Sequence, residues 1–158
     1  MGLFDFVKDA GAKILNRESE PETESAEEQL GELRKANELL RFALSMELPV
    51  HDLKVEFDDG VATVHGKADT TAVKENVIIG IGNVEGVAQV DDRMQVVTVE
   101  PPAQFYTVKP GDSLSKIAQA YYGDPMKYTT IFEANKPMLT DPDKIYPGQV
   151  VRIPAIQS

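Results

Sequence analysis

Residues 53–65, Leu-Lys-Val-Glu-Phe-Asp-Asp-Gly-Val-Ala-Thr-Val-His, decide the fold of the first half of this chain. Apolar side chains at positions 53, 55 and 57 alternate with charged ones, which is the two-residue period of a half-buried strand. Asp59-Gly60 is the dipeptide that a two-residue hairpin turn favours. A second strand follows directly over residues 61–65. This stretch therefore predicts a β-hairpin.

Helical patterns flank the hairpin on both sides. A helix is predicted from about Ser25 to Glu47, and a second one starts at Asp69 or Thr70, either of which can cap it. The chain then passes through residues 82–86 into a third strand, about 87–99. The predicted order is α-β-β-α-β over residues 29–99, with both helices on one face of the sheet. The apolar residues expected to face inward are Leu30, Leu33, Leu40 and Leu44 in the first helix and Val73, Val77, Ile78 and Ile81 in the second. The residues expected on the outer face of the first helix are Glu32, Arg34, Lys35 and Glu38.

The pattern restarts after a proline-containing linker at residues 100–104. A short strand at 105–108 leads through a turn to a helix capped by Ser113 and closed by Gly123. Asp124-Pro125 has the character of a second helix start, that helix ends at Asn135, and a strand at 149–154 completes the unit. The fold class is thus α+β, with two small domains, the second being β-α-α-β over residues 105–155. Some fifty residues make a small core, so a surface of the first module would help to stabilise it.

The N-terminus predicts an additional helix over residues 1–15. Leu3, Phe6, Val7, Ala10 and Ile14 recur at helical spacing. Acidic residues on its polar side favour packing on the protein itself over binding to anionic lipid. Residues 16–28 are acidic and nearly free of apolar side chains, which is typical of a mobile connector.

Charge and composition exclude several partners. The net charge is −10, and residues 1–103 carry 21 acidic and 10 basic side chains, so that they alone account for −11. Nucleic acid and an anionic membrane surface are therefore not expected as partners. The chain has no cysteine and no run of about 20 apolar residues that could span a membrane. The first residues lack a secretory signal, so we expect a cytoplasmic, monomeric protein.

No catalytic motif is apparent. His51 and His65 are the only histidines, and they lack the spacing of metal ligands. The serines have no partner at motif spacing, and Asp91-Asp92 is interpreted as a solvated strand edge. We expect a binding protein, not an enzyme.

The two modules of this chain resemble two known domain families. The first module resembles a BON domain through its element order, Asp59-Gly60, the run 64–66 and the run 84–90 (Val-Glu-Gly-Val-Ala-Gln-Val). The second resembles a LysM domain through residues 106–114 (Tyr-Thr-Val-Lys-Pro-Gly-Asp-Ser-Leu), Asn135 and residues 145–154. The whole chain is similar to a family of small bacterial potassium-binding proteins with BON–LysM architecture. That resemblance implies a cytoplasmic potassium (K+) sensor or buffer that changes conformation when it binds the ion.

Potassium sites are built mostly from neutral carbonyl oxygens, which replace the water around a large monovalent ion. Helix C-termini offer such oxygens, because their last four C=O groups lack partners within the helix. Two segments with glycine, 7–12 and 82–87, fit this description. The alternative is that these glycines only end helices. The resemblance implies the following carbonyl ligands: Val7, Ala10, Ala12, Gly82, Val84 and Val87.

The second module leaves two interpretations open. A LysM domain implies a groove for N-acetylglucosamine-containing glycans, here between residues 111–114 and 137–139. The other interpretation, which we favour, is that this surface docks on the first module and stabilises its ion-bound state. An envelope protein that binds glycan through LysM and lipid through BON is the alternative function, and a scaffold for other proteins is a third.

Overall fold

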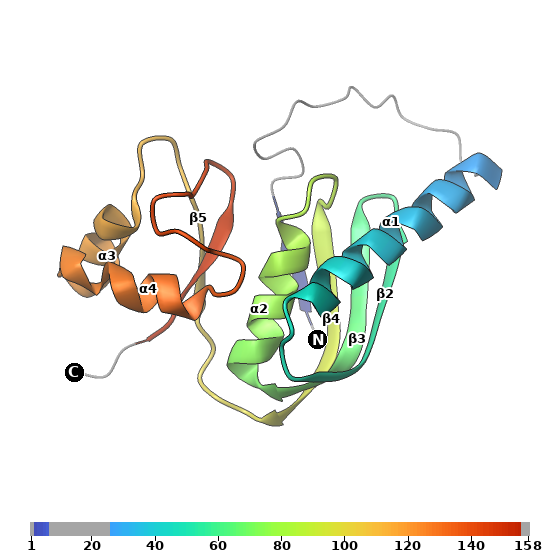
Figure 1. The fold of residues 1–158 in the computed structure, drawn as a ribbon, viewed down its shortest axis with the longest axis horizontal. Helices are drawn as coiled ribbons and strands as arrows, with labels where there is room; N and C mark the ends of the chain where they lie inside the picture. Colours follow the sequence, from blue (N-terminus) through green and yellow to red (C-terminus); the bar gives the residue numbers. More distant parts are fainter. Residues whose placement is uncertain (1, 7–25, 156–158) are drawn as a thin grey trace.

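The structure is a computed structural model that describes residues 2–6 and 26–155. In the first module, helices α1 and α2 cover one face of a four-stranded sheet (Figure 1). The strand order in that sheet is β1-β4-β3-β2. The elements are β1 (Gly2–Asp5), α1 (Ala26–Ser45), β2 (Val50–Asp58), β3 (Val61–Thr70), α2 (Thr71–Gly82) and β4 (Gln89–Thr98).

The predicted hairpin is confirmed. Asp59 and Gly60 both have positive φ angles, 51° and 84°, as a two-residue turn between antiparallel strands requires. Thr70 is the cap of α2, and its side chain accepts a hydrogen bond from the backbone N–H of Val73. α2 then carries the chain across the sheet, so that β4 pairs in parallel with β3. The order α-β-β-α-β is as predicted, in a mixed sheet.

The N-terminal prediction is wrong for the residues that the structure describes. Gly2–Asp5 form β1, which pairs antiparallel with β4. Phe4 and Phe6 pack against the core whereas Leu3 is 57% exposed, so the apolar side chains alternate as they do in a strand. Residues 7–25 lie outside the described part of the chain, and Ala26–Glu28 of the expected connector belong to α1.

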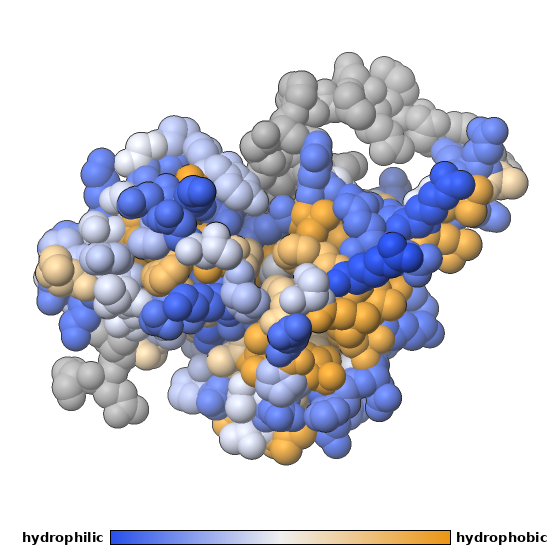
Figure 2. Space-filling model, viewed as in Figure 1, coloured by the Kyte–Doolittle hydropathy of each residue, from blue (hydrophilic) through white to orange (hydrophobic). Residues whose placement is uncertain are grey.

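The buried face of α1 also differs from the prediction. Leu30, Leu33 and Leu44 are exposed, whereas Leu40 packs against the core as predicted. The buried residues of α1 are Ala36, Leu39 and Ala43. Alanine lets a helix approach its neighbours closely, whereas the leucines lie on the flank of the stripe. Figure 1 shows the first turns of α1 running past β2, and Figure 2 shows apolar surface along the helix.

The second module has the predicted β-α-α-β order. The Ser113 side chain accepts a hydrogen bond from Lys116 N–H at the start of α3, and Gly123 ends that helix at φ 77°. Asp124 caps a short 3₁₀ helix that leads into α4. The elements are β5 (Gln104–Thr107), α3 (Leu114–Tyr122), the 3₁₀ helix Pro125–Lys127, α4 (Tyr128–Ala134) and β6 (Val150–Ile153).

The linker between the modules is attached to α2. The Glu100 carboxylate accepts from Ala72 N–H at 3.1 Å, and Glu100 N–H donates to the Thr71 hydroxyl at 2.8 Å. Ala103 N–H donates to the Glu75 carboxylate at 3.1 Å. These bonds hold the linker against α2.

Candidate functional site

The site predicted from the sequence is described in part. Gly82, Val84 and Val87 lie at the C-terminal end of α2 and in the loop that follows, whereas Val7, Ala10 and Ala12 fall outside the described residues. Phe6, the last described residue before residue 7, lies beside the described part of the site. Its ring packs so closely on Gly82 that a Cβ atom there would overlap it, and its N–H donates to Ala88 O at 2.8 Å.

The three predicted carbonyl ligands at this end of α2 differ in their hydrogen bonding: Val84 O accepts one bond, and Gly82 O and Val87 O accept none from the described residues. Val84 N–H donates to Ile81 O at 3.1 Å, and Val87 N–H donates to Val84 O at 3.2 Å. Within the described residues, no hydrogen bond ends on the carbonyl oxygens of Gly82 or Val87. A helix C-terminus also carries partial negative charge. Neutral oxygens in a negative field suit a weakly hydrated cation.

One basic side chain reaches this loop from another element. The Lys35 ammonium group on α1 donates to Glu85 O at 2.6 Å, and the side chain is only 20% exposed. Its Cε and Nζ atoms would both lie 3.4 Å from a Cβ atom at Gly86, whose φ is 97°. Lys35 was expected on the outer face of α1, yet it covers the loop between two predicted ligands.

Asn83, between two predicted ligands, binds the second module. Its side-chain amide donates to Val150 O at 2.8 Å and accepts from Val150 N–H at 2.9 Å. The same amide lies 3.0 Å from the sulfur of Met138. The loop that a glycan groove would use is thus in contact with α2 at this residue.

The contact between the modules continues along α2. Glu75, Ile79 and Asn83 are spaced four residues apart and so share one helix face. Glu75 forms an ion pair with Arg152 of β6 at 2.9 Å, and both side chains are 7% exposed. Ile79 between them is fully buried. At the other edge, the rings of Phe4 in β1 and Phe105 in β5 lie 5.3 Å apart. The expected contact between the modules is present.

The residues of β6 alternate between the core of the second module and the contact with α2. Val151 and Ile153 belong to the core of the second module, whereas Val150 and Arg152 bind residues of α2. Asn135, fully buried, holds the strand by exchanging hydrogen bonds with the backbone of Arg152 at 2.7 and 3.0 Å. All four residues of β6 are therefore buried.

Other candidate sites are weaker. In the described part of the chain, no three His, Cys, Asp or Glu side chains are grouped to hold a metal ion. Asp91 and Asp92 were expected on a solvated strand edge, and for Asp92 this is wrong. Asp92 is 1% exposed and pairs with Lys74 at 2.9 Å, while Asp91 binds Arg93. His51 and His65 lie near Asp69 and Glu56 respectively. No described helix is both long and apolar enough to cross a bilayer.

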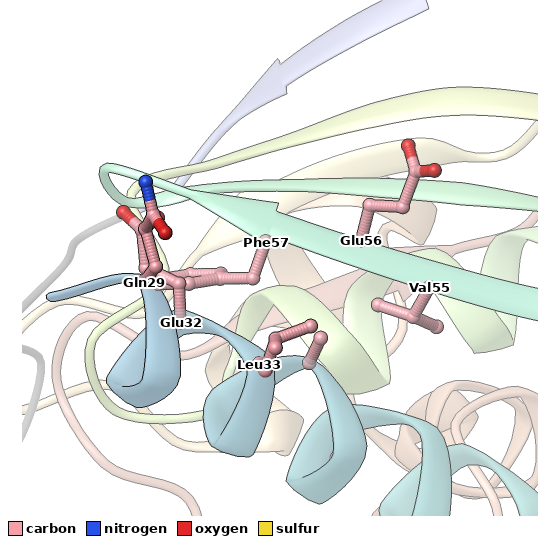
Figure 3. Close-up of a pocket in the computed structure, with 7 residues that line it drawn as sticks. Gln29, Glu32, Leu33, Val55, Glu56 and Phe57 are labelled. Atoms are coloured by element: carbon pink, nitrogen blue, oxygen red, sulfur yellow. The ribbon is translucent and has the colours of Figure 1, made fainter. Parts of the chain in front are cut away.

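A groove of about 280 Å³ opens between α1 and β2. Figure 3 shows Leu33, Val55 and Phe57 along it, with the carboxylate of Glu32 at its rim. The Glu32 carboxylate is occupied, because it accepts from Asp59 N–H at 2.9 Å. Apolar side chains line this groove, and none of the predicted ligands does.

Comparison with known proteins agrees with this architecture. Residues 35–98 match the BON domain model and residues 106–154 match the LysM domain model. The chain is 43% identical over 155 residues to potassium binding protein Kbp of Escherichia coli, covering 98% of this chain and 99% of that protein. The chain belongs to this BON–LysM family. It is also 61% identical over 49 residues to an uncharacterised protein of Deinococcus radiodurans, covering 31% of this chain and 19% of that protein.

Membership of the BON–LysM family confirms the resemblance drawn from the sequence, but three residues at the site were not predicted. Phe6 was assigned to a helix, Lys35 to a solvated face and Asn83 to a connecting loop. A lone polar residue after a glycine is typical of a helix end, so sequence spacing gave no signal that Asn83 binds another domain. Phe6 follows β1, Lys35 lies on α1 and Asn83 caps α2, so that only the fold brings these residues to the loop 82–87.

Proposed function

We propose that this protein binds potassium through backbone carbonyl groups at the C-terminal end of α2 and acts as a cytoplasmic sensor or buffer of the ion. The observation that carries the proposal is the pair of carbonyls, Gly82 and Val87, that accept no hydrogen bond from the described residues. The printed name of the E. coli relative, a potassium binding protein, supports the choice of ion. Val84 O accepts one hydrogen bond from Val87 N–H, and because a carbonyl oxygen has two lone pairs it remains a ligand in this proposal. Residues 7–12 supply the other ligands, Val7, Ala10 and Ala12.

The proposed conformational change is the attachment of the N-terminal segment to the end of α2, where Phe6 packs on Gly82. A potassium ion shared by residues 7–12 and 82–87 binds only when the two segments lie together, so it shifts the equilibrium toward the attached state. The second module acts as a clamp, since Asn83 attaches β6 to the middle of the ion-binding loop.

Contacts in the second module favour docking over glycan binding. Met138, on one side of the glycan groove, is beside Asn83. On the other side, Asp112 accepts hydrogen bonds from the Tyr106 hydroxyl and from Lys109 N–H. Those polar groups are therefore engaged within the protein.

Thermal unfolding in KCl and in NaCl at equal ionic strength tests the proposal. Because a ligand that binds only the folded state stabilises it, we expect a higher melting temperature in KCl. At a hundred times the dissociation constant the gain is about 2.7 kcal/mol. Equal melting temperatures in the two salts, together with no heat of potassium binding by calorimetry, would refute potassium binding.

Two glycine variants locate the site. Gly86 and Gly123 have φ angles of 97° and 77°, so alanine is strained at both positions by about 1–2 kcal/mol. Gly86→Ala distorts the loop that carries Val84 and Val87, and we expect it to weaken potassium binding. Gly123→Ala applies a similar strain at the end of α3 and should leave the affinity unchanged. If both variants bind potassium as well as the wild type does, the loop is not the site.

A further inference from the structure

The loop after α2 receives a positive charge from a different helix. α2, which is described throughout, has no basic side chain in its last turn. Lys35 of α1 instead reaches the loop that follows α2 and donates to Glu85 O at 2.6 Å. Ordering a lysine side chain costs rotamer entropy, which the attraction between the ammonium group and Glu85 O offsets. One carbonyl of this loop therefore already contacts a monovalent cation.

An ammonium group and a potassium ion interact with carbonyl oxygens in the same way, as positive charges that replace water. Glu85 O lies between the predicted ligands Val84 and Val87 in the chain. The ammonium lies 2.6 Å from Glu85 O, and consecutive Cα atoms are about 3.8 Å apart, so an ion held by those neighbours lies roughly 10 Å from the Lys35 ammonium. Two positive charges at this distance repel each other.

From this contact we infer that Lys35 is a built-in competing cation, which lowers the affinity of the loop for potassium and so sets the concentration at which the site fills. The inference rests on the proposed function and adds its regulation. Glu38, which pairs with Lys35 at 3.5 Å and is 59% exposed, offsets only part of the positive charge because water screens it.

The test is potassium affinity, measured by calorimetry on the full chain, for the wild type and for Lys35→Met. Methionine keeps the apolar stem over Gly86 and is a good helix former, but it removes the charge. Removing a like charge at about 10 Å, at an effective dielectric constant of about 20–80, is expected to tighten binding roughly two-fold to fifteen-fold. Lys35→Arg keeps the charge and should bind as the wild type does.

Lys116→Met is the matched control. Lys116 also donates to a loop carbonyl, Gly111 O at 3.0 Å, but in the second module. It changes the net charge by the same amount, and we expect no change in affinity. The gain from Lys35→Met should shrink as choline chloride is added, because salt screens the repulsion. A purely structural role of Lys35 would not produce that dependence.

The outcomes are distinguishable from failure of the proposed function. If the wild type itself binds no potassium, the proposed function is wrong. If the wild type binds and Lys35→Met binds equally or more weakly, Lys35 does not compete with the ion and only this inference is overturned. An equal gain for Lys116→Met would show an effect of net charge and would also overturn it.

Discussion

At the scale of single residues, Gly82 shows how closely the N-terminal segment approaches α2. The ring of Phe6 occupies the space that a side chain at position 82 would need. Gly80, two residues earlier on the same helix, faces the end of the flexible Met46 side chain, with Cε 2.8 Å from a Cβ atom placed there. The two positions therefore differ in how easily their neighbours can move.

This difference gives a prediction for the two alanine variants. Alanine gains about 0.5–1 kcal/mol over glycine in a helix. For Gly80→Ala the gain and the small shift of Met46 roughly cancel. For Gly82→Ala overpacking against Phe6 costs about 1–3 kcal/mol, and potassium affinity falls because Phe6 is displaced. Urea unfolding and calorimetry measure both effects. Equal stability of the two variants would show that Phe6 does not hold this position.

Sequence reasoning is limited at this scale. The carbonyl ligands in loop 82–87 were suggested by resemblance, and glycine spacing alone favoured the interpretation that these glycines only end helices. The partners of Asn83 and Lys35 could not be predicted, because each side chain makes its contact with an element far away in the chain. Asp92 was placed on a solvated edge for the same reason, since Lys74 reaches it from α2.

At the scale of elements, local signals were read correctly where they are strong. The caps at Thr70 and Ser113 and the Asp59-Gly60 turn all formed as predicted, because each depends on neighbours within four residues. β1 was missed because its pairing partner, β4, lies more than 80 residues away. The spacing of Phe4 and Phe6 fits a strand or a helix until it is known that β4 offers an edge with which this segment can pair.

The turn between β5 and α3 contains a hydrogen bond that makes stability depend on pH. The Tyr106 hydroxyl donates to Asp112, which raises the pKa of Tyr106 from 10.0 to about 12. The same bond, with Lys109 N–H, lowers the pKa of Asp112 below its ordinary 3.8. The contribution to stability is therefore present between these limits. It is lost as pH falls below 3.8, and it is lost again as pH rises from 10.0 toward 12.

The variants Tyr106→Phe and Asp112→Asn test this dependence. Tyr106→Phe should be less stable than the wild type at neutral pH, and the difference should vanish at both extremes. Asp112→Asn should lose the acid-induced part of the decline. Urea midpoints across the pH range measure these effects, and tyrosinate absorbance gives the pKa of Tyr106. A constant difference at all pH values would contradict the prediction.

At the scale of the whole molecule, the two modules share one boundary. Glu75, Ile79 and Asn83 on α2 face β6, and the linker is bonded to the first turn of the same helix. Removing one partner of a buried ion pair such as Glu75–Arg152 typically costs about 3–5 kcal/mol. The second module is therefore stabilised by the first, as expected from its small core. A change at the end of α2 reaches β6 through Asn83.

The tyrosines make this coupling measurable. The chain has no tryptophan, and its five tyrosines all lie between residues 106 and 146. Tyrosine fluorescence therefore reports unfolding of the second module alone. If potassium binds the first module and Asn83 transmits the effect, KCl should raise the urea midpoint of the tyrosine signal relative to NaCl.

Asn83→Ala should abolish that potassium-dependent shift. The variant leaves the N–H and C=O of Val150 without their partners, which costs about 1–3 kcal/mol for a buried group. Asn76→Ala is the control, because it makes the same substitution on α2 at a side chain whose oxygen has no hydrogen-bond partner among the described residues. It should keep the shift. If Asn83→Ala destabilises the second module but keeps the full potassium-dependent shift, potassium acts on the second module by another route. The bond between Asn83 and β6 would then hold the modules together without carrying the response to potassium.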